Sequence, residues 1–119
     1  MENPIIEWRK MEQKKVLVLT FGETFSTSDC EQAVVTCENL FQNAGNEKIT
    51  MIWECLKMQR YDSPARSLWQ RMLKNNKDRI GTIWLIADSL VIKAGARVIS
   101  NITSYDIKNV SSFDEIKIT

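Results

Sequence analysis

The sequence predicts an α/β domain with a mixed sheet, in which the first strand is antiparallel, the other strands are parallel, and helices pack over them. Three observations indicate this fold. Continuous apolar runs, typical of strands buried on both faces, begin near Val16, Ile49 and Thr82. Segments with apolar residues at helical spacing follow these runs. Strands that alternate with helices usually form parallel sheets through β-helix-β crossovers.

We expect residues 1–119 to form a single domain, because 119 residues suffice for one hydrophobic core and not for two. Apolar residues make up 44% of the chain, an ordinary share for a globular protein. The apolar runs are much shorter than the roughly 20 residues of a membrane span. The opening MENPIIEWRK lacks the pattern of a secretory signal. A cytoplasmic location is therefore expected.

Missing residue types narrow the possible chemistry. The chain has no histidine, so imidazole bases and histidine metal ligands are excluded. Cys30, Cys37 and Cys55 lack CxxC spacing and are expected to be small buried residues without disulfides. No glycine-rich phosphate loop and no GxSxG elbow occurs. We therefore expect no histidine-dependent hydrolase triad, no serine-hydrolase elbow and no glycine-loop phosphate site, and neither a metal nor a cofactor is predicted.

The first two strands should form an antiparallel hairpin within residues 5–21, turning at Glu12 and Gln13. Ile6 and Trp8 alternate with charged residues, as in a half-exposed edge strand. A helix should begin at Ser28, since Glu31 three residues later completes a capping-box pattern. Its buried stripe is expected to be Cys30, Ala33, Val34, Cys37, Leu40, Phe41 and Ala44, and Gly45 should close it.

A second helix is expected over residues 64–74, after the strand near Ile49. Ser63 would be its cap and Pro64 its first residue, where the missing N–H has no helical partner. The inner stripe would be Ala65, Leu68, Trp69, Met72 and Leu73.

A third helix should start at Asp88 or Ser89, with Val91, Ala94, Val98, Ile99 and Ile102 as its inner stripe. Leu90 and Ile92 lie outside that stripe, where they suit an apolar pocket, a dimer surface or ordinary core. Residues 105–110 are typical of an outer strand, and Ser112 with Glu115 predicts a last helix of one or two turns.

Charge is segregated along the chain although the net charge is only +1. Residues 20–56 contain six acidic and one basic residue, whereas residues 57–79 contain seven basic and two acidic ones. These are either solvated faces of opposite sign or a surface for a partner. A basic stripe interleaved with exposed aromatic residues is missing, so no nucleic-acid partner is expected.

Polar residues follow each predicted parallel strand, at the sheet edge where open α/β sheets keep their sites. They are Thr20, Glu23 and Thr24, then Tyr61, Asp62 and Ser63, then Asp88, Ser89 and Lys93. Serine or aspartate before a helix is usually a cap. A magnesium site formed by Glu23, Asp62 and Asp88 is an alternative, although no paired acid follows the first strand.

The order of elements, together with MIWECLKMQRYDSPARSLWQRML, resembles the STAS domain family, the anti-sigma-factor antagonist (SpoIIAA-like) domains. The resemblance covers nearly the whole chain. It implies a regulatory interaction module that is not an enzyme and has no catalytic residue. In antagonist members of the family a kinase phosphorylates a serine of an Asp-Ser-Ser-Gly loop. Here the loop reads Asp62-Ser63-Pro64-Ala65, and Pro64 aligns with the phosphorylated serine.

The resemblance therefore implies a regulatory protein partner of the kinase or anti-sigma type in a bacterial cytoplasm, with a homodimer possible. The expected contact residues are Arg60, Tyr61, Asp62, Ser63, Arg66, Asp88 and Ser89. Ser63 is either a helix cap or a modified site, since a phosphate there would meet free amides and Arg66. The rival function is a carrier or sensor of a small apolar or anionic ligand, as in the related SEC14 type; an enzyme is the third candidate.

Overall fold

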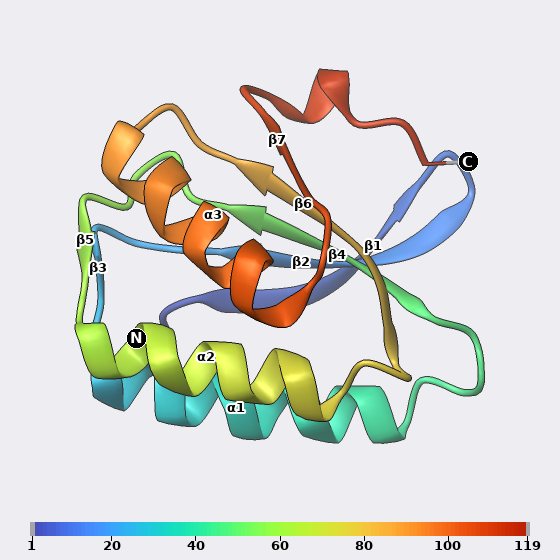
Figure 1. The fold of residues 1–119 in the computed structure, drawn as a ribbon. Helices are drawn as coiled ribbons and strands as arrows, with labels where there is room; N and C mark the ends of the chain where they lie inside the picture. Colours follow the sequence, from blue (N-terminus) through green and yellow to red (C-terminus); the bar gives the residue numbers. More distant parts are fainter. Residues whose placement is uncertain (1, 119) are drawn as a thin grey trace.

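The computed structural model describes residues 2–118, which form a five-stranded sheet, a two-stranded ribbon and three α-helices (Figure 1). The large sheet comprises β1 (Ile5–Met11), β2 (Lys14–Thr20), β4 (Ile49–Glu54), β6 (Ile80–Ile86) and β7 (Ile107–Val110). The ribbon comprises β3 (Thr24–Phe25) and β5 (Arg60–Tyr61). The helices are α1 (Thr27–Gln42), α2 (Ser63–Asn75) and α3 (Leu90–Thr103), and a 3-10 turn, η1, spans Phe113–Glu115.

The predicted mixed sheet is confirmed. Its strand order is β1-β2-β4-β6-β7, with β1 antiparallel to β2 and every other pair parallel. The three apolar runs are thus neighbours, and Val18, Ile52 and Trp84 are in register across them. The hairpin turns at Glu12 and Gln13, which have positive φ values of 51° and 68°, as the tight turn of a two-residue hairpin requires.

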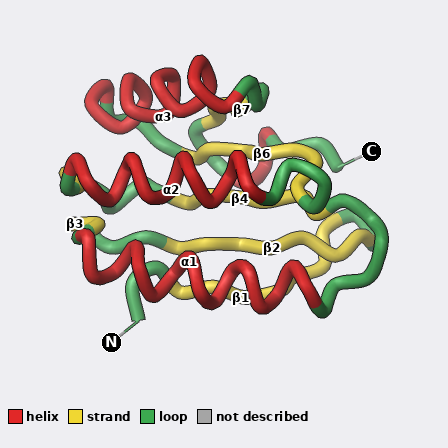
Figure 2. Tube along the Cα trace, turned by 60° about the horizontal axis from the view of Figure 1, so that its bottom comes forward, coloured by secondary structure: helices red, strands yellow, loops and turns green. Residues whose placement is uncertain are grey.

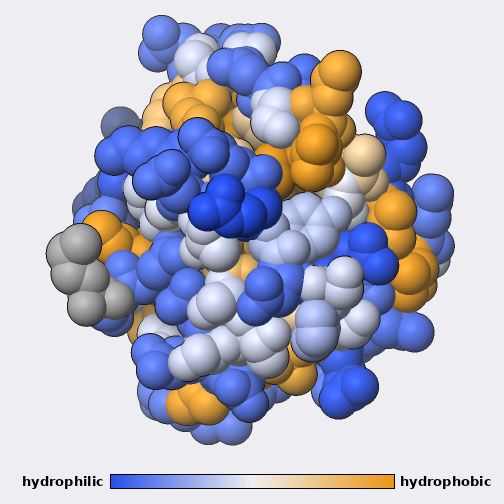
Figure 3. Space-filling model, turned by 90° about the vertical axis from the view of Figure 1, so that its left-hand side faces the viewer, coloured by the Kyte–Doolittle hydropathy of each residue, from blue (hydrophilic) through white to orange (hydrophobic). Residues whose placement is uncertain are grey.

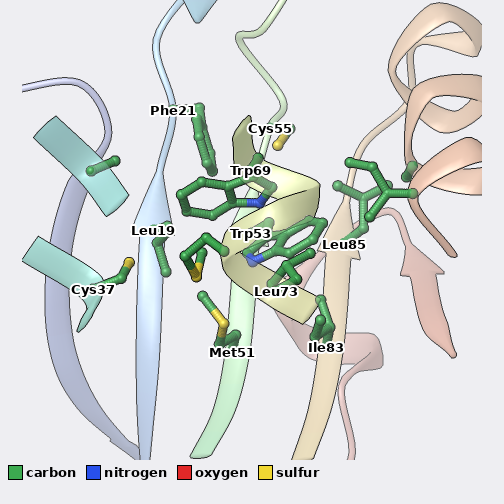
Figure 4. Close-up of a cluster of buried hydrophobic side chains, with 14 of the residues drawn as sticks. Leu19, Phe21, Cys37, Met51, Trp53, Cys55, Trp69, Leu73, Ile83 and Leu85 are labelled. Atoms are coloured by element: carbon green, nitrogen blue, oxygen red, sulfur yellow. The ribbon is translucent and has the colours of Figure 1, made fainter. Parts of the chain in front are cut away.

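All three helices cover one face of the sheet (Figure 2). Strand residues alternate between faces, so Leu17 and Leu19 of β2 point toward the helices whereas Val16 and Val18 point away. The helix-side core gathers residues from β2, β4, β6 and all three helices, with Trp53 and Trp69 at its centre (Figure 4). The predicted stripes of α1 and α2 belong to this core or pack against it.

The C-terminal segment covers the opposite face. Ile116 and Ile118 pack on Val16, Val18, Ile52, Trp84 and Ile86. The amide of Ile118 donates to Glu12 Oε2 at 2.9 Å, which ties the segment to the hairpin turn. The predicted Ser112–Glu115 capping box is present at η1.

Two predicted helix starts are wrong. The cap of α1 is Ser26 and not Ser28, and its capping-box partner is Asp29 instead of Glu31. Asp29 satisfies two donors at once, because its carboxylate accepts from the Ser26 amide while its own amide donates to Ser26 Oγ. Asp62, not Ser63, precedes α2, so Pro64 is the second helical residue. Ser89 caps α3, as expected.

The predicted inner stripe of α3 is out of phase. Ile99 is buried as predicted, whereas Val91, Ala94 and Ile102 are exposed. The other buried residues of the helix are Ile92, Gly95, Ala96 and Thr103. The apolar pattern predicted the wrong phase because Gly95 faces the core without an apolar side chain that would mark it. Across residues 2–118, no helix has the length and apolar character needed to cross a membrane.

Candidate functional site

The loop before α2 is anchored to the loop before α1 by the β3–β5 ribbon. Arg60 and Tyr61 pair in parallel with Thr24 and Phe25. The amides of Gln59 and Asp62 donate to Glu23 O and Phe25 O, at 2.7 and 3.0 Å. The ribbon stands at the carboxyl edge of the sheet, beyond the ends of β2 and β4 (Figure 1).

Asp62 connects the starts of two helices. It is the residue before α2, yet its side chain makes no capping hydrogen bond there. Instead, Oδ2 accepts from the Thr27 amide at 2.8 Å and from Thr27 Oγ1 at 3.2 Å, at the start of α1. A carboxylate in this place satisfies an unpaired amide and complements the positive end of the α1 dipole. The first turn of α2 is consequently left without a side-chain cap.

Ser63 is exposed and is the first residue of α2. Within residues 2–118 its hydroxyl has no hydrogen-bond partner, so the side chain performs no capping that would explain it. Arg66, one turn further on, is the nearest basic residue of the helix in sequence and is half-buried. Ser63 and Arg66 are three residues apart on α2, so they lie within one helical turn.

Tyr61 extends from the ribbon to α3, where it packs against Gly95. A β-carbon added to Gly95 would lie 2.5 Å from the Tyr61 hydroxyl oxygen and 3.0 Å from the ring carbon that bears it. Glycine at this position is thus what allows the ring to approach the helix. Tyr61 and Gly95 together join the loop before α2 to α3.

A cavity of about 60 Å³ lies beneath this contact, between α2, α3 and the sheet. Its walls are almost entirely apolar and include Phe25, Trp53, Tyr61, Arg66, Trp69, Ile92 and Ile99. Four edge-to-face aromatic pairs surround Trp69 and Phe21, with ring centroids 5.0 to 6.3 Å apart. Such pairs add stability beyond the area they bury, so they stabilise this wall of the cavity.

Three buried polar atoms around the cavity and on α2 have no hydrogen-bond partner: Trp53 Nε1, Arg66 Nε and Gln70 Oε1. Arg66 and Gln70 are four residues apart on α2, a spacing at which helical side chains are neighbours. The indole N–H of Trp53 is buried, since this residue is only 4% exposed. A buried N–H without a partner is unusual and suits a site that receives an acceptor.

Asp88 and Ser89 lie at the start of α3. Ser89 accepts from the Ile92 amide at 3.4 Å, and Asp88 is exposed. No hydrogen bond among residues 2–118 joins either residue to Ser63. The link between the two groups is indirect, since Tyr61 and Arg66 line the cavity from one side and Ile92 from the other.

Residues 2–118 contain no group of three or more His, Cys, Asp or Glu side chains placed to hold a metal ion. Glu23, Asp62 and Asp88 therefore do not gather into the alternative magnesium site. All three cysteines are free and buried, as predicted. Burial, aided by nearby acidic groups, raises the pKa of the Cys30 thiol to about 12. Burial also raises the pKa of Cys37 to about 12 and raises that of Cys55, so the three thiols are protonated and unreactive near neutral pH.

Exposed apolar side chains occur at the carboxyl edge of the sheet. Leu56, in the loop after β4, is 50% exposed, and Leu90 and Val91, at the start of α3, are 81% and 59% exposed. Figure 3 views the molecule from this edge, and hydrophobic surface is visible toward its top among hydrophilic residues. Neighbouring exposed apolar residues of this size are typical of a surface that contacts another molecule.

The sheet order and the helices on one face define an α/β domain with a SpoIIAA-like fold. The structure resembles an uncharacterized protein of the DUF3478 family with a SpoIIAA-like fold from Shewanella loihica PV-4, with a TM-score of 0.75 and 13% identity. That match covers 97% of this chain and 91% of the other. The resemblance to STAS domains is thereby confirmed at the level of the fold.

Two further structures are those of SpoIIAA itself. The anti-sigma factor antagonist SpoIIAA in its unphosphorylated form matches with a TM-score of 0.59 and 15% identity, over 93% of this chain and 92% of that one. The Bacillus cell fate determinant SpoIIAA in its phosphorylated form matches with a TM-score of 0.65 and 13% identity, over 93% and 95%. No protein-family model matches the sequence, and no curated protein matches it.

Several residues that shape this region were missed by the sequence analysis. Thr27 and Gly95 are the partners of Asp62 and Tyr61, but both are distant in sequence from the residues they contact. The sequence AGA at 94–96, inside an apolar helix, is a signal of close packing that could have identified Gly95. Nothing in the sequence pairs Asp62 with Thr27.

Proposed function

We propose that this protein is a non-enzymatic regulatory module that docks a protein partner. The contact surface comprises Arg60, Tyr61, Asp62, Ser63 and Arg66, with Asp88 and Ser89 at the same sheet edge; we call it the edge surface. Support comes from the SpoIIAA-like fold and from the restraint of the loop by the ribbon, by Thr27 and by Gly95. A loop that is already ordered loses little conformational freedom on binding.

The observation that carries this proposal is Ser63. Its hydroxyl is exposed on the first residue of an α-helix and takes part in no capping bond among the described residues. Helix capping therefore does not explain why residue 63 is a serine. A phosphate on Ser63 would meet the uncapped positive end of α2 and the neighbouring Arg60 and Arg66. Ser63 is thus the candidate for a switch in this loop, one position before the family's phosphorylated serine.

A protein fits this edge better than a polar small molecule does. The exposed apolar residues Leu56, Leu90 and Val91 follow β4 and begin α3, at the same edge of the sheet as the charged loop. Protein interfaces commonly combine an apolar centre with a polar rim that includes arginine and tyrosine. The partner class that the resemblance implies is a kinase or an anti-sigma-type regulator.

Affinity capture from the native host tests the proposal. Wild-type protein should recover a specific partner, which Arg66→Glu and Ser63→Asp should lose. Arg71→Glu reverses an exposed charge on the same helix outside the edge surface and should keep it. Equal recovery by all four proteins, or by none, would contradict docking through this edge.

The cavity favours a second candidate, a carrier or sensor of a small ligand. Its apolar walls and the unpaired Trp53 Nε1 suit an apolar group that carries one acceptor. A volume of about 60 Å³ admits only a small group, so a longer ligand would require α2 and α3 to separate.

Native mass spectrometry of freshly purified protein tests this candidate. A co-purifying small molecule that is lost in a cavity-filling Ala96→Met variant would support a carrier. Retention of the molecule by that variant would place it elsewhere, and an unliganded mass in every preparation would argue against this role.

A further inference from the structure

A different cavity lies on the other flank of α3, between that helix and the strands β6 and β7. Its volume is about 260 Å³. Its walls include Lys93, Arg97 and Ser100 from α3 and Leu85, Ile107 and Asn109 from the sheet. It combines two charged, two polar and three apolar residues.

The two cations of this cavity lack a compensating charge. Lys93 and Arg97 are the only charged residues of α3, and both line the cavity. The ion pair present within residues 2–118 joins Arg9 to Glu7. Neither Lys93 nor Arg97 therefore forms an ion pair with a carboxylate of these residues. Lys93 lies in the first turn of α3, toward the positive end of the helix dipole, where a cation is disfavoured, whereas Arg97 lies in the middle of the helix. Two unpaired cations at one cavity favour an anion there.

The polar groups of the cavity offer acceptors. Asn109 Nδ2 is engaged, since it donates to Leu85 O at 3.1 Å and to Ala87 O at 3.4 Å. The Ser100 hydroxyl donates to Tyr105 O. Asn109 Oδ1 and the lone pairs of Ser100 Oγ are the groups that these bonds leave for a ligand. The cavity thus presents two cationic donors, two neutral acceptors and an apolar floor formed by Leu85 and Ile107.

We propose that this cavity binds a small organic anion, a phosphate or carboxylate that also carries a hydroxyl or amino group. Lys93 and Arg97 would hold the anionic group, and Asn109 Oδ1 and Ser100 Oγ would accept from its hydroxyl or amino hydrogen. The volume of about 260 Å³ equals roughly eight or nine waters at ~30 Å³ each, which suits a compact metabolite. The site contains none of the residues of the edge surface, and it shares only Leu85 and Ala96 with the walls of the apolar cavity.

Titration of ¹⁵N-labelled protein, followed by amide chemical shifts, tests the site. The probes are 3-phosphoglycerate, citrate and pyrophosphate, with glycerol as the uncharged comparison. At about 0.15 M salt, where exposed charges are largely screened, 3-phosphoglycerate should shift amides of residues 93–100 and 107–109 saturably. A dissociation constant of about 1 mM or lower is expected, and glycerol should cause no saturable shift.

Charge-neutralising variants identify the residues. Lys93→Gln and Arg97→Gln should each weaken 3-phosphoglycerate about tenfold or more, because each removes a charge-assisted hydrogen bond. Arg71→Gln, on the exposed side of α2, should bind as the wild type does; the amide spectra confirm that each variant is folded. Absence of saturable shifts with all three anions up to about 10 mM, shifts confined to another surface, or equal loss in Arg71→Gln would overturn the proposal.

Discussion

The carboxylate of Asp62 binds the amide of Thr27 at 2.8 Å, across 35 residues of sequence. One side chain thereby stabilises the start of α1 while its backbone begins α2. Because the loop before α2 contains Ser63, the same contact positions the central residue of the edge surface. The stability of the fold and the geometry of the candidate site are coupled at this residue.

Replacing Asp62 with alanine should lower the free energy of unfolding by about 0.5–2 kcal/mol, the usual cost of losing a helix cap. Asp62→Asn should retain most of this stability, since the oxygen of the asparagine amide can still accept from the Thr27 amide. Urea unfolding monitored by circular dichroism measures both. An Asp62→Ala protein as stable as the wild type would show that the contact with Thr27 contributes nothing.

The two serines near helix starts should respond differently to alanine. Ser26→Ala should cost about 1 kcal/mol, because its hydroxyl accepts from the Asp29 amide at 3.0 Å. Ser63→Ala should stay within about 0.5 kcal/mol, as at an ordinary surface position. A large loss in Ser63→Ala would mean that its hydroxyl has a structural role after all.

Gly95→Ala should destabilise the protein despite the better helix propensity of alanine. The added methyl group would be forced to within 2.5 Å of the Tyr61 hydroxyl, and overpacking of this kind costs about 1–3 kcal/mol. The cost should be smaller in a Tyr61→Phe background, where the closest atom is gone. A double-mutant cycle by urea unfolding measures the difference, and strict additivity would contradict direct contact.

Alkaline pH should lower the free energy of unfolding through the buried side chains of Cys37 and Tyr105. Burial raises the pKa of Cys37 from 9.0 to about 12 and that of Tyr105 from 10.0 to about 12. Because the folded state keeps these protons longer than the unfolded chain, the stability they contribute is complete below about pH 9 and is lost as pH rises toward 12. Each group adds a slope of up to about 1.4 kcal/mol per pH unit.

Unfolding by urea at a series of pH values from neutral to alkaline measures this loss. Cys37→Ala should show a shallower decline, because one of the raised thiols is removed. Cys37 has no hydrogen bond among the described residues, so the substitution changes little besides its volume and its titration. A decline that is identical in the variant would assign the alkaline effect to other groups.

The sequence by itself determined which segments become buried strands and which become helices, since continuous apolar runs and helical spacing are local properties. The resemblance of that order to STAS domains was enough to predict the sheet correctly. Ser63 and Arg66 were identified as neighbours because they share one helical turn. These features depend on residues close together in the chain, where spacing alone sets geometry.

Only the tertiary structure decided which hydroxyl caps which helix, which face of α3 is buried, and where cavities remain. Asp62 meets Thr27 and Tyr61 meets Gly95 because the β3–β5 ribbon and the packing of α3 bring distant segments into contact. The phase of α3 was missed because its buried face is lined by glycine and alanine, whose apolar signal is weak. Close packing between elements, which no local pattern records, sets these contacts.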